Sequence, residues 1–170
     1  MTVPAVDPRR AEDVRSIATM MQEVLDRIVG GYEQSGVHLP ERRYTTTGTP
    51  PVDCEQAVVV FRQAYIGPVG DEADGPQRCD GPRTAALEVH VSRCIPTPKG
   101  TRGTTPGAAE IQSAAEQQMI DAWLLLDLAP STDTWNGLAP GGPGVIATVE
   151  AGEPQGGYQT TVLMLTMQVP

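Results

Sequence analysis

The sequence predicts an α+β fold in which two helices pack on one face of a mostly antiparallel four-stranded sheet, in the order α-β-β-α-β-β. Three observations lead to this prediction. The chain has 170 residues, which is typical of one domain, so we expect a single domain over 1–170. Two stretches carry apolar residues at three- and four-residue spacing, as in amphipathic helices. Four other stretches are apolar runs or alternating patterns typical of strands.

The first helix is expected over residues 11–29, where apolar positions recur with helical spacing. An Asp-Pro pair at 7–8 suits the N-cap and the first helical position. Two glycines at 30–31 can take the positive φ at which helices often end. Both ends of this helix are therefore predicted from local residues.

Two strands are expected in the middle of the chain. Residues 54–66 contain a valine run typical of a central strand buried on both faces. Residues 83–95 alternate between apolar and polar, which predicts a half-buried strand antiparallel to the first. A long acidic loop over 67–82, rich in Gly and Pro, joins them. The Thr-rich segment 42–47 is suited to a short edge strand, outside the four strands of the predicted sheet.

A second helix is expected over residues 108–127, begun by the Thr-Pro pair at 105–106. Its predicted buried side carries Ile111, Ala114, Ala115, Met119, Ala122, Leu125 and Leu126. Trp123 lies in the same helix, and we expect it to pack in the core or at an interface rather than to serve as a cofactor platform.

The chain is expected to close with a β-hairpin. After a second long loop over 129–144, strands are predicted at 145–150 and 158–169, joined through 152–157. The glycines of this joining segment are reminiscent of a phosphate loop. It joins two strands, however, and it lacks the lysine and the helix start that a phosphate loop requires. We therefore interpret it as a hairpin turn.

Composition argues against several classes of function. The chain has 21 acidic and 12 basic residues, and its net charge of -9 disfavours binding by neutralisation of nucleic-acid phosphates. Even a long apolar run such as residues 57–61 is too short to cross a bilayer. The N-terminus lacks the apolar core of a secretory signal, so we expect a protein that stays in a cytoplasm.

The three cysteines, Cys54, Cys79 and Cys94, predict neither a zinc site nor catalysis. None lies in a CxxC motif or at zinc-ligand spacing from a histidine, and reduced thiols are the expected state in a cytoplasm. A Cys54–Cys79 or a Cys79–Cys94 bridge stays open as an alternative after cell lysis. A small hydrolase that uses Cys54 or Cys79 is the remote alternative. We expect no enzyme, no cofactor and no metal.

Several segments together carry a resemblance to a known family. They are Leu39-Pro-Glu-Arg-Arg-Tyr-Thr-Thr-Thr-Gly, Asp53-Cys-Glu-Gln with the valine run behind it, Arg78-Cys-Asp-Gly-Pro-Arg, Asp121-Ala-Trp, and Gly144-Val-Ile-Ala-Thr-Val-Glu-Ala-Gly-Glu-Pro-Gln-Gly-Gly-Tyr-Gln with the closing Leu-Thr-Met-Gln-Val-Pro. On these residues, within 39–170, the chain resembles the tail-terminator proteins of long-tailed bacteriophages, in particular those of actinobacterial phages.

The resemblance implies a structural virion protein with a tail-terminator-like fold. Such a subunit forms a ring, usually a hexamer, that caps the tail tube, ends its polymerisation and offers a surface to the head-tail connector protein. DNA would pass through the ring without specific binding, and we expect negative charge along the bore. The implied location is the virion neck, after assembly in the host bacterial cytoplasm. Another neck component, such as a head-to-tail stopper, is the main alternative.

Two groups of polar residues are candidate contacts with neighbouring rings. The first lies in the loop 67–82 and consists of Asp71, Glu72, Asp74, Arg78 and Asp80. Its acids lack the spacing of an EF-hand, and a loop tip without a partner is the alternative interpretation. The second group lies at the hairpin turn and consists of Glu150, Glu153 and Gln155. For these residues the alternative is ordinary solvated surface charge.

Overall fold

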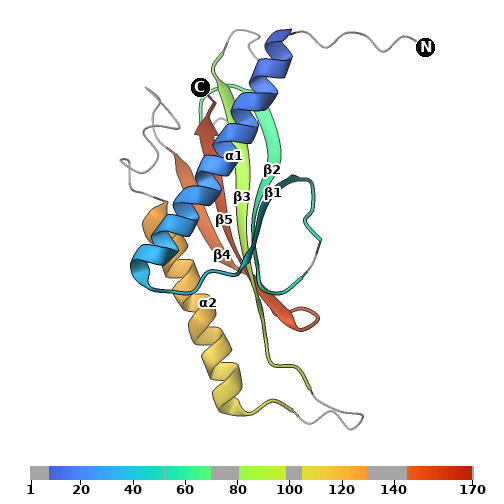
Figure 1. Cartoon of the computed structure of the whole chain (residues 1–170), viewed down its shortest axis with the longest axis vertical. Coiled ribbons are helices and arrows are strands. Elements are labelled where there is room, and N and C mark those ends of the chain that lie inside the picture. The colour runs from blue at the N-terminus through green and yellow to red at the C-terminus, as the bar shows by residue number, and fades with distance from the viewer. Residues whose placement is uncertain (1–7, 52, 70–80, 99–104, 130–144, 170) are drawn as a thin grey trace, which may run out of the picture.

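The structure, a computed structural model, describes residues 8–51, 53–69, 81–98, 105–129 and 145–169. Two helices cover one face of a five-stranded mixed sheet (Figure 1). The helices are α1 (Pro8–Ser35) and α2 (Ala108–Leu128). The strands are β1 (Arg42–Thr47), β2 (Gln56–Ile66), β3 (Arg83–Cys94), β4 (Ile146–Ala151) and β5 (Tyr158–Gln168).

The strand order within the sheet is β1-β2-β3-β5-β4, so β1 and β4 form its two edges. The predicted α+β class is confirmed, but the prediction of a four-stranded sheet in the order α-β-β-α-β-β is wrong. The segment 42–47 forms a fifth strand that pairs in parallel with β2, whereas the other neighbouring pairs are antiparallel. The short edge strand predicted at 42–47 is therefore confirmed. The predicted sheet did not include it, because its pairing depends on the connection 48–55, which brings the chain back alongside β1.

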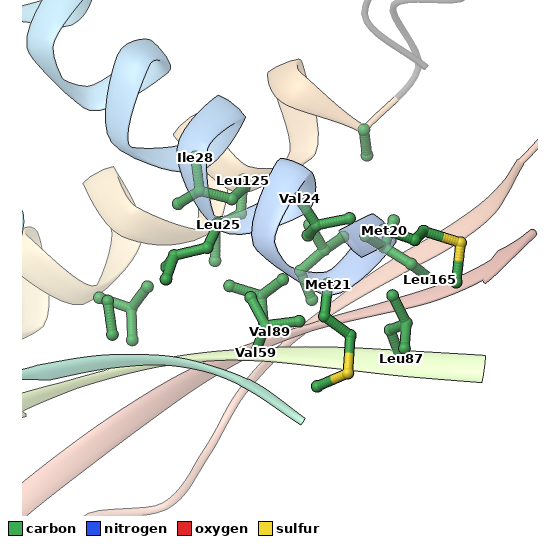
Figure 2. Close-up of a cluster of buried hydrophobic side chains, with 14 of the residues drawn as sticks. Met20, Met21, Val24, Leu25, Ile28, Val59, Leu87, Val89, Leu125 and Leu165 are labelled. Atoms are coloured by element: carbon green, nitrogen blue, oxygen red, sulfur yellow. The ribbon is translucent and has the colours of Figure 1, made fainter. Parts of the chain in front are cut away.

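The core lies between the helices and the face of the sheet that they cover. Figure 2 shows Met21, Val24 and Leu25 of α1 near Val59 and Val89 of the sheet. The alternation predicted for β3 is confirmed, because its apolar members are buried in this core while alternate residues point to the other face. We call this other side, which neither α1 nor α2 covers, the open face.

The two glycines at 30–31 do not end α1, contrary to the prediction. Gly31 instead permits close packing of the helices, since a Cβ there would lie 2.5 Å from a methyl carbon of Leu128 on α2. Tyr32 is fully buried and stabilises the additional turn. The helix ends before Gly36, whose φ of 71° is in the left-handed region favoured by glycine.

The helix α2 begins at residue 108, as predicted, but its capping residue differs from the prediction. The N-cap is Gly107 rather than the Thr-Pro pair at 105–106, and the backbone N–H of Gly107 donates a 2.8 Å hydrogen bond to Oε2 of Glu110. This carboxylate also lies in the first turn, where the helix dipole favours negative charge. The predicted cap of α1, Asp7, lies outside the described residues. In the described part of the chain, no helix is long and apolar enough to span a membrane.

The side of α2 that faces the sheet matches the predicted side only in part. Asp121 and Leu125 are buried, whereas Ile111, Met119 and Leu126, which were expected inside, are exposed. The predicted stripe therefore lies partly on the outer surface of the protein. The cause is a buried polar network centred on Asp121.

Candidate functional site

An apolar surface covers the outside of α2. Its residues are Ile111, Met119, Ile120, Trp123 and Leu126, and we call them the α2 outer face. Trp123 is 65% exposed and Met119 is 58% exposed. A shallow hollow on this surface is lined by Trp123 together with Glu116 and Asp127. These exposed apolar side chains make the outside of α2 the candidate interaction surface.

A buried polar network fixes this orientation of α2. Nη2 of Arg93 on β3 donates a 2.7 Å hydrogen bond to Oδ1 of Asp121, and Nε of Arg93 donates to Oδ2. The hydroxyl of Tyr32 on α1 donates to Oδ1 of Asp121 at 3.0 Å, and Nη2 of Arg93 also reaches the carbonyl of His38 at 2.7 Å. One carboxylate thus joins both helices to the sheet.

The network shifts the pKa values of Tyr32 and Arg93. Burial first, and then the charge and hydrogen bond of Asp121, raise the pKa of Tyr32 far above its usual range. Burial lowers the pKa of Arg93, but its hydrogen bonds and attraction to Asp121 more than offset this and raise the pKa overall. Arg93 is therefore a permanent cation matched to Asp121, and α2 must present Asp121 to the sheet.

Two glutamines add further polar contacts on the inner side of α2. Nε2 of Gln118 donates a 2.9 Å hydrogen bond to the carbonyl of Gly152, and Nε2 of Gln159 donates a 2.7 Å hydrogen bond to the carbonyl of Ala114. Gly152 itself lies close to β5 in the hairpin, where a Cβ would lie 2.8 Å from the carbonyl oxygen of Thr160. Polar side chains therefore hold the inside of α2, and apolar ones cover much of its outside.

Basic residues are confined to the first 102 residues of the chain. All 12 lysines and arginines precede Gly103, so α2, β4 and β5 carry no basic side chain. We call α2 together with the edge strand β4 the acidic flank, which carries Glu116, Asp127 and Glu150. Among the described residues, every exposed large hydrophobic side chain except Ile66 belongs to this flank. The opposite edge strand, β1, carries two exposed arginines and no acid.

The hairpin residues predicted as contacts do not form one cluster. Glu150 lies on the edge strand β4, opposite Val162 of β5. Glu153 and Gln155 lie at the rim of a hollow of about 240 Å³ on the open face. The hollow lies between the hairpin and the loop 49–51, and its other lining residues are Gln56, His90, Ser92, Gly152, Tyr158, Thr160 and Val162.

Polar side chains beside this hollow are already engaged with one another. Glu88 accepts a 2.7 Å hydrogen bond from Nε of Arg62 and lies 2.7 Å from Nε2 of His90. Burial raises the pKa of Glu88, but the hydrogen bonds and charges of Arg62 and His90 outweigh it and lower the pKa overall. Ser92 is paired with Thr160, with 2.9 Å between their hydroxyl oxygens. These contacts stabilise the open face of the sheet.

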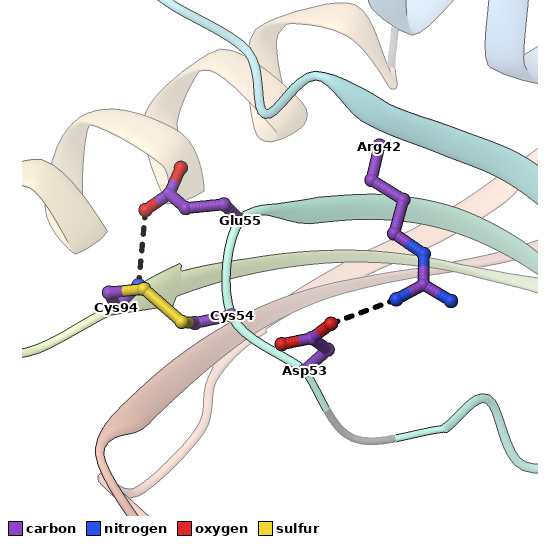
Figure 3. Close-up of a disulfide and its surroundings, with 5 residues drawn as sticks. All are labelled: Arg42, Asp53, Cys54, Glu55 and Cys94. Atoms are coloured by element: carbon purple, nitrogen blue, oxygen red, sulfur yellow. Dashed lines mark hydrogen bonds and ion pairs between the residues drawn. A yellow bond between two sulfur atoms is a disulfide. The ribbon is translucent and has the colours of Figure 1, made fainter.

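The cysteine prediction is corrected by a disulfide between Cys54 and Cys94 (Figure 3). It joins the approach to β2 with the end of β3, whereas reduced thiols, or bridges through Cys79, were expected. Next to it, Oε1 of Glu55 accepts a 3.1 Å hydrogen bond from the backbone N–H of Cys94. Cys79 lies outside the described residues. The bridge occupies the thiol that a Cys54 nucleophile would need.

The other predicted contact group, with Asp71, Glu72, Asp74, Arg78 and Asp80, also lies outside the described residues. Within the described ranges, no cluster of three or more His, Cys, Asp or Glu side chains is placed to hold a metal ion. The sequence-based predictions did not include the roles of Tyr32 and Arg93. Tyr32 lies beyond the predicted end of the first helix, whereas Arg93 lies on the face of the predicted strand 83–95 that otherwise carries apolar residues, and this was the available signal. Neither the protein-family models nor the curated proteins give a match to the chain.

Proposed function

We propose that this protein is a structural subunit of a bacteriophage neck that forms a ring on the tail tube, ends tube polymerisation and offers a surface to the head connector. The observation that carries the proposal is the α2 outer face. A folded domain that places Trp123 and Met119 in solvent, while it buries the charged Asp121 beneath them, has the surface of an assembly component. The resemblance of residues 39–170 to tail terminators selects this kind of assembly.

The distribution of charge agrees with such a ring. A ring requires contacts between two different patches of each subunit, and here the acidic flank and the arginine-bearing β1 edge differ in chemistry. The net charge of -9 suits a ring through which DNA passes without being held. The partners in this proposal are further copies of the chain, the tail-tube protein and the head-tail connector protein.

The test is polymerisation of the tail-tube protein with and without this chain, scored by electron microscopy for tube length and for a ring at one tube end. We expect one terminal ring and tubes of limited length when the chain is present. Tubes of unchanged length without a terminal ring would contradict the proposal. If the chain then bound the portal-side connector instead, the head-to-tail stopper would become the better interpretation.

A further inference from the structure

We propose that copies of this chain associate head to tail, with the acidic flank of one copy binding the β1 edge of the next. The inference rests on the proposed function, in that it names the surfaces through which ring subunits meet. It follows from the two sheet edges, from the charges that they carry and from the position of the α2 outer face.

The two edge strands are matched in length and direction. β1 and β4 each have six residues, and each has one side without a neighbour in the sheet. The sequence of parallel and antiparallel pairs across the sheet makes β4 antiparallel to β1. A second copy in the same orientation would therefore add its β1 to β4 as an antiparallel neighbour, which is how exposed sheet edges commonly associate.

The side chains of the two edges are complementary in one register. Arg42 of β1 and Glu150 of β4 both point to the open face, as their pairings with Gln56 and Val162 show. If Glu150 stands opposite Arg42 of the next copy, Thr148 stands opposite Tyr44 on the same face. Opposite charges placed across neighbouring strands stabilise the pair. Within its own copy, Arg42 forms an exposed ion pair with Asp53, and its guanidinium lies 5.3 Å from the centre of the Tyr44 ring. Exposed ion pairs of this kind contribute little to stability.

On the helix side of the sheet, α2 lies over β4 and α1 lies over β1, so the same contact would bring α1 of the incoming copy alongside α2. Arg43 of β1 points to that side, as its pairing with Ala57 shows. The exposed Trp123 lies between Glu116 and Asp127, and this arrangement suits a guanidinium that stacks on the indole and faces two carboxylates. Packing of α2 against α2 of a second copy would instead bring like charges together. The charges thus favour the head-to-tail arrangement.

The test compares self-association of the full-length chain by analytical ultracentrifugation, up to a concentration of about 1 mM. We expect the wild type to form closed oligomers. Arg42→Glu, Glu150→Arg and Trp123→Glu should each weaken association by at least about 30-fold, as expected for central interface residues. The double variant Arg42→Glu/Glu150→Arg should recover association, because it exchanges the two charges. Ser113→Glu adds the same charge to an exposed site elsewhere on α2 and should behave as wild type.

A mixture separates this arrangement from a symmetric one. Trp123→Glu retains a functional β1 edge and Arg42→Glu retains a functional acidic flank, so the two together should form a one-to-one dimer that grows no further. A wild type that stays monomeric overturns the proposal. A normal oligomer of Arg42→Glu would also overturn the proposal, because association would then not need the β1 edge and α2 could pair with α2 of a second copy. Circular dichroism melts check that each variant is folded.

The outcome is separable from that of the tail-terminator proposal. Head-to-tail oligomers that leave tube length unchanged would support these contacts and refute the function. Controlled tube length with the charge-swap rescue absent would support the function and refute the contacts.

Discussion

Asp121 is the residue on which the arrangement of both helices depends, and its removal tests this. Asp121→Ala leaves the guanidinium of Arg93 buried without its counter-charge, so we expect the free energy of unfolding to fall by about 3–5 kcal/mol. Urea denaturation measures the change. Asp127→Ala, on the exposed side of the same helix, should change it by less than about 0.5 kcal/mol. Equal losses for the two variants would show that the network does not hold α2 in place.

Glu88 gives the fold a dependence on acid. Its pKa is lower in the folded state than in the unfolded chain, so its contribution is complete above the unfolded value of about 4.3 and is lost as the pH falls through the folded value. Glu88→Gln should therefore flatten the decline of the melting temperature below about pH 5. Glu23→Gln, which alters an exposed glutamate of α1, is the matched control. An unchanged decline in Glu88→Gln would contradict the assignment.

At the scale of elements, the adjacent glycines of α1 provide a matched pair. Alanine is favoured over glycine in a helix by about 0.5–1 kcal/mol. Gly30→Ala should show this gain in the free energy of unfolding, because no atom lies within 4 Å of the added methyl. Gly31→Ala should instead lose about 1–3 kcal/mol by overpacking against Leu128. Thermal unfolding measures both variants. A gain at both positions would mean that α1 and α2 are not closely packed.

The disulfide joins the start of β2 to the end of β3, and its contribution follows from the length of chain that it closes. For a sequence separation of 40 residues, the loop-closure model gives about 4 kcal/mol. Unfolding in denaturant, with and without reductant, should show a loss of about 2–4 kcal/mol on reduction. Cys54→Ser/Cys94→Ser should reproduce the loss and become insensitive to reductant, whereas Cys79→Ser should retain the wild-type response. A reductant effect that disappears with Cys79→Ser would point to a bridge through that residue.

Features set by local periodicity were predictable, whereas features set by partners distant in sequence were not. The alternation of β3 assigned its two faces correctly, since each residue follows from its neighbours. In α2 the consecutive leucines 124–126 occupy different sides of the helix, so apolar spacing could not select the inner side. That choice was made by Arg93, which lies 28 residues from Asp121. The disulfide follows from the register of β2 and β3. The pairing of Gln56 with Ser92, extended by two residues along each strand, places Cys54 opposite Cys94.

At the scale of the whole molecule, the division of charge between an acidic flank and an arginine-bearing edge predicts that self-association depends on salt. Raising the salt concentration from about 0.1 M to about 1 M shortens the Debye length from about 10 Å to about 3 Å. We therefore expect the dissociation constant of wild-type oligomers to rise several-fold over this range, as measured by ultracentrifugation. Arg42→Glu should lose part of this dependence, because it lacks one of the cations that face the acidic flank.

Trp123→Glu distinguishes the apolar part of the contact from the charged part. It removes buried apolar area and adds a negative charge next to Glu116 and Asp127, so its association should be weak at low salt and should recover partly as the added repulsion is screened. The wild type and this variant should therefore respond to salt in opposite directions. This result is expected if the contact depends both on attraction between the acidic flank and the β1 edge and on apolar packing at the α2 outer face. Association of the wild type that strengthens steadily with salt would instead assign the contact to apolar packing alone, with the arginines of β1 uninvolved.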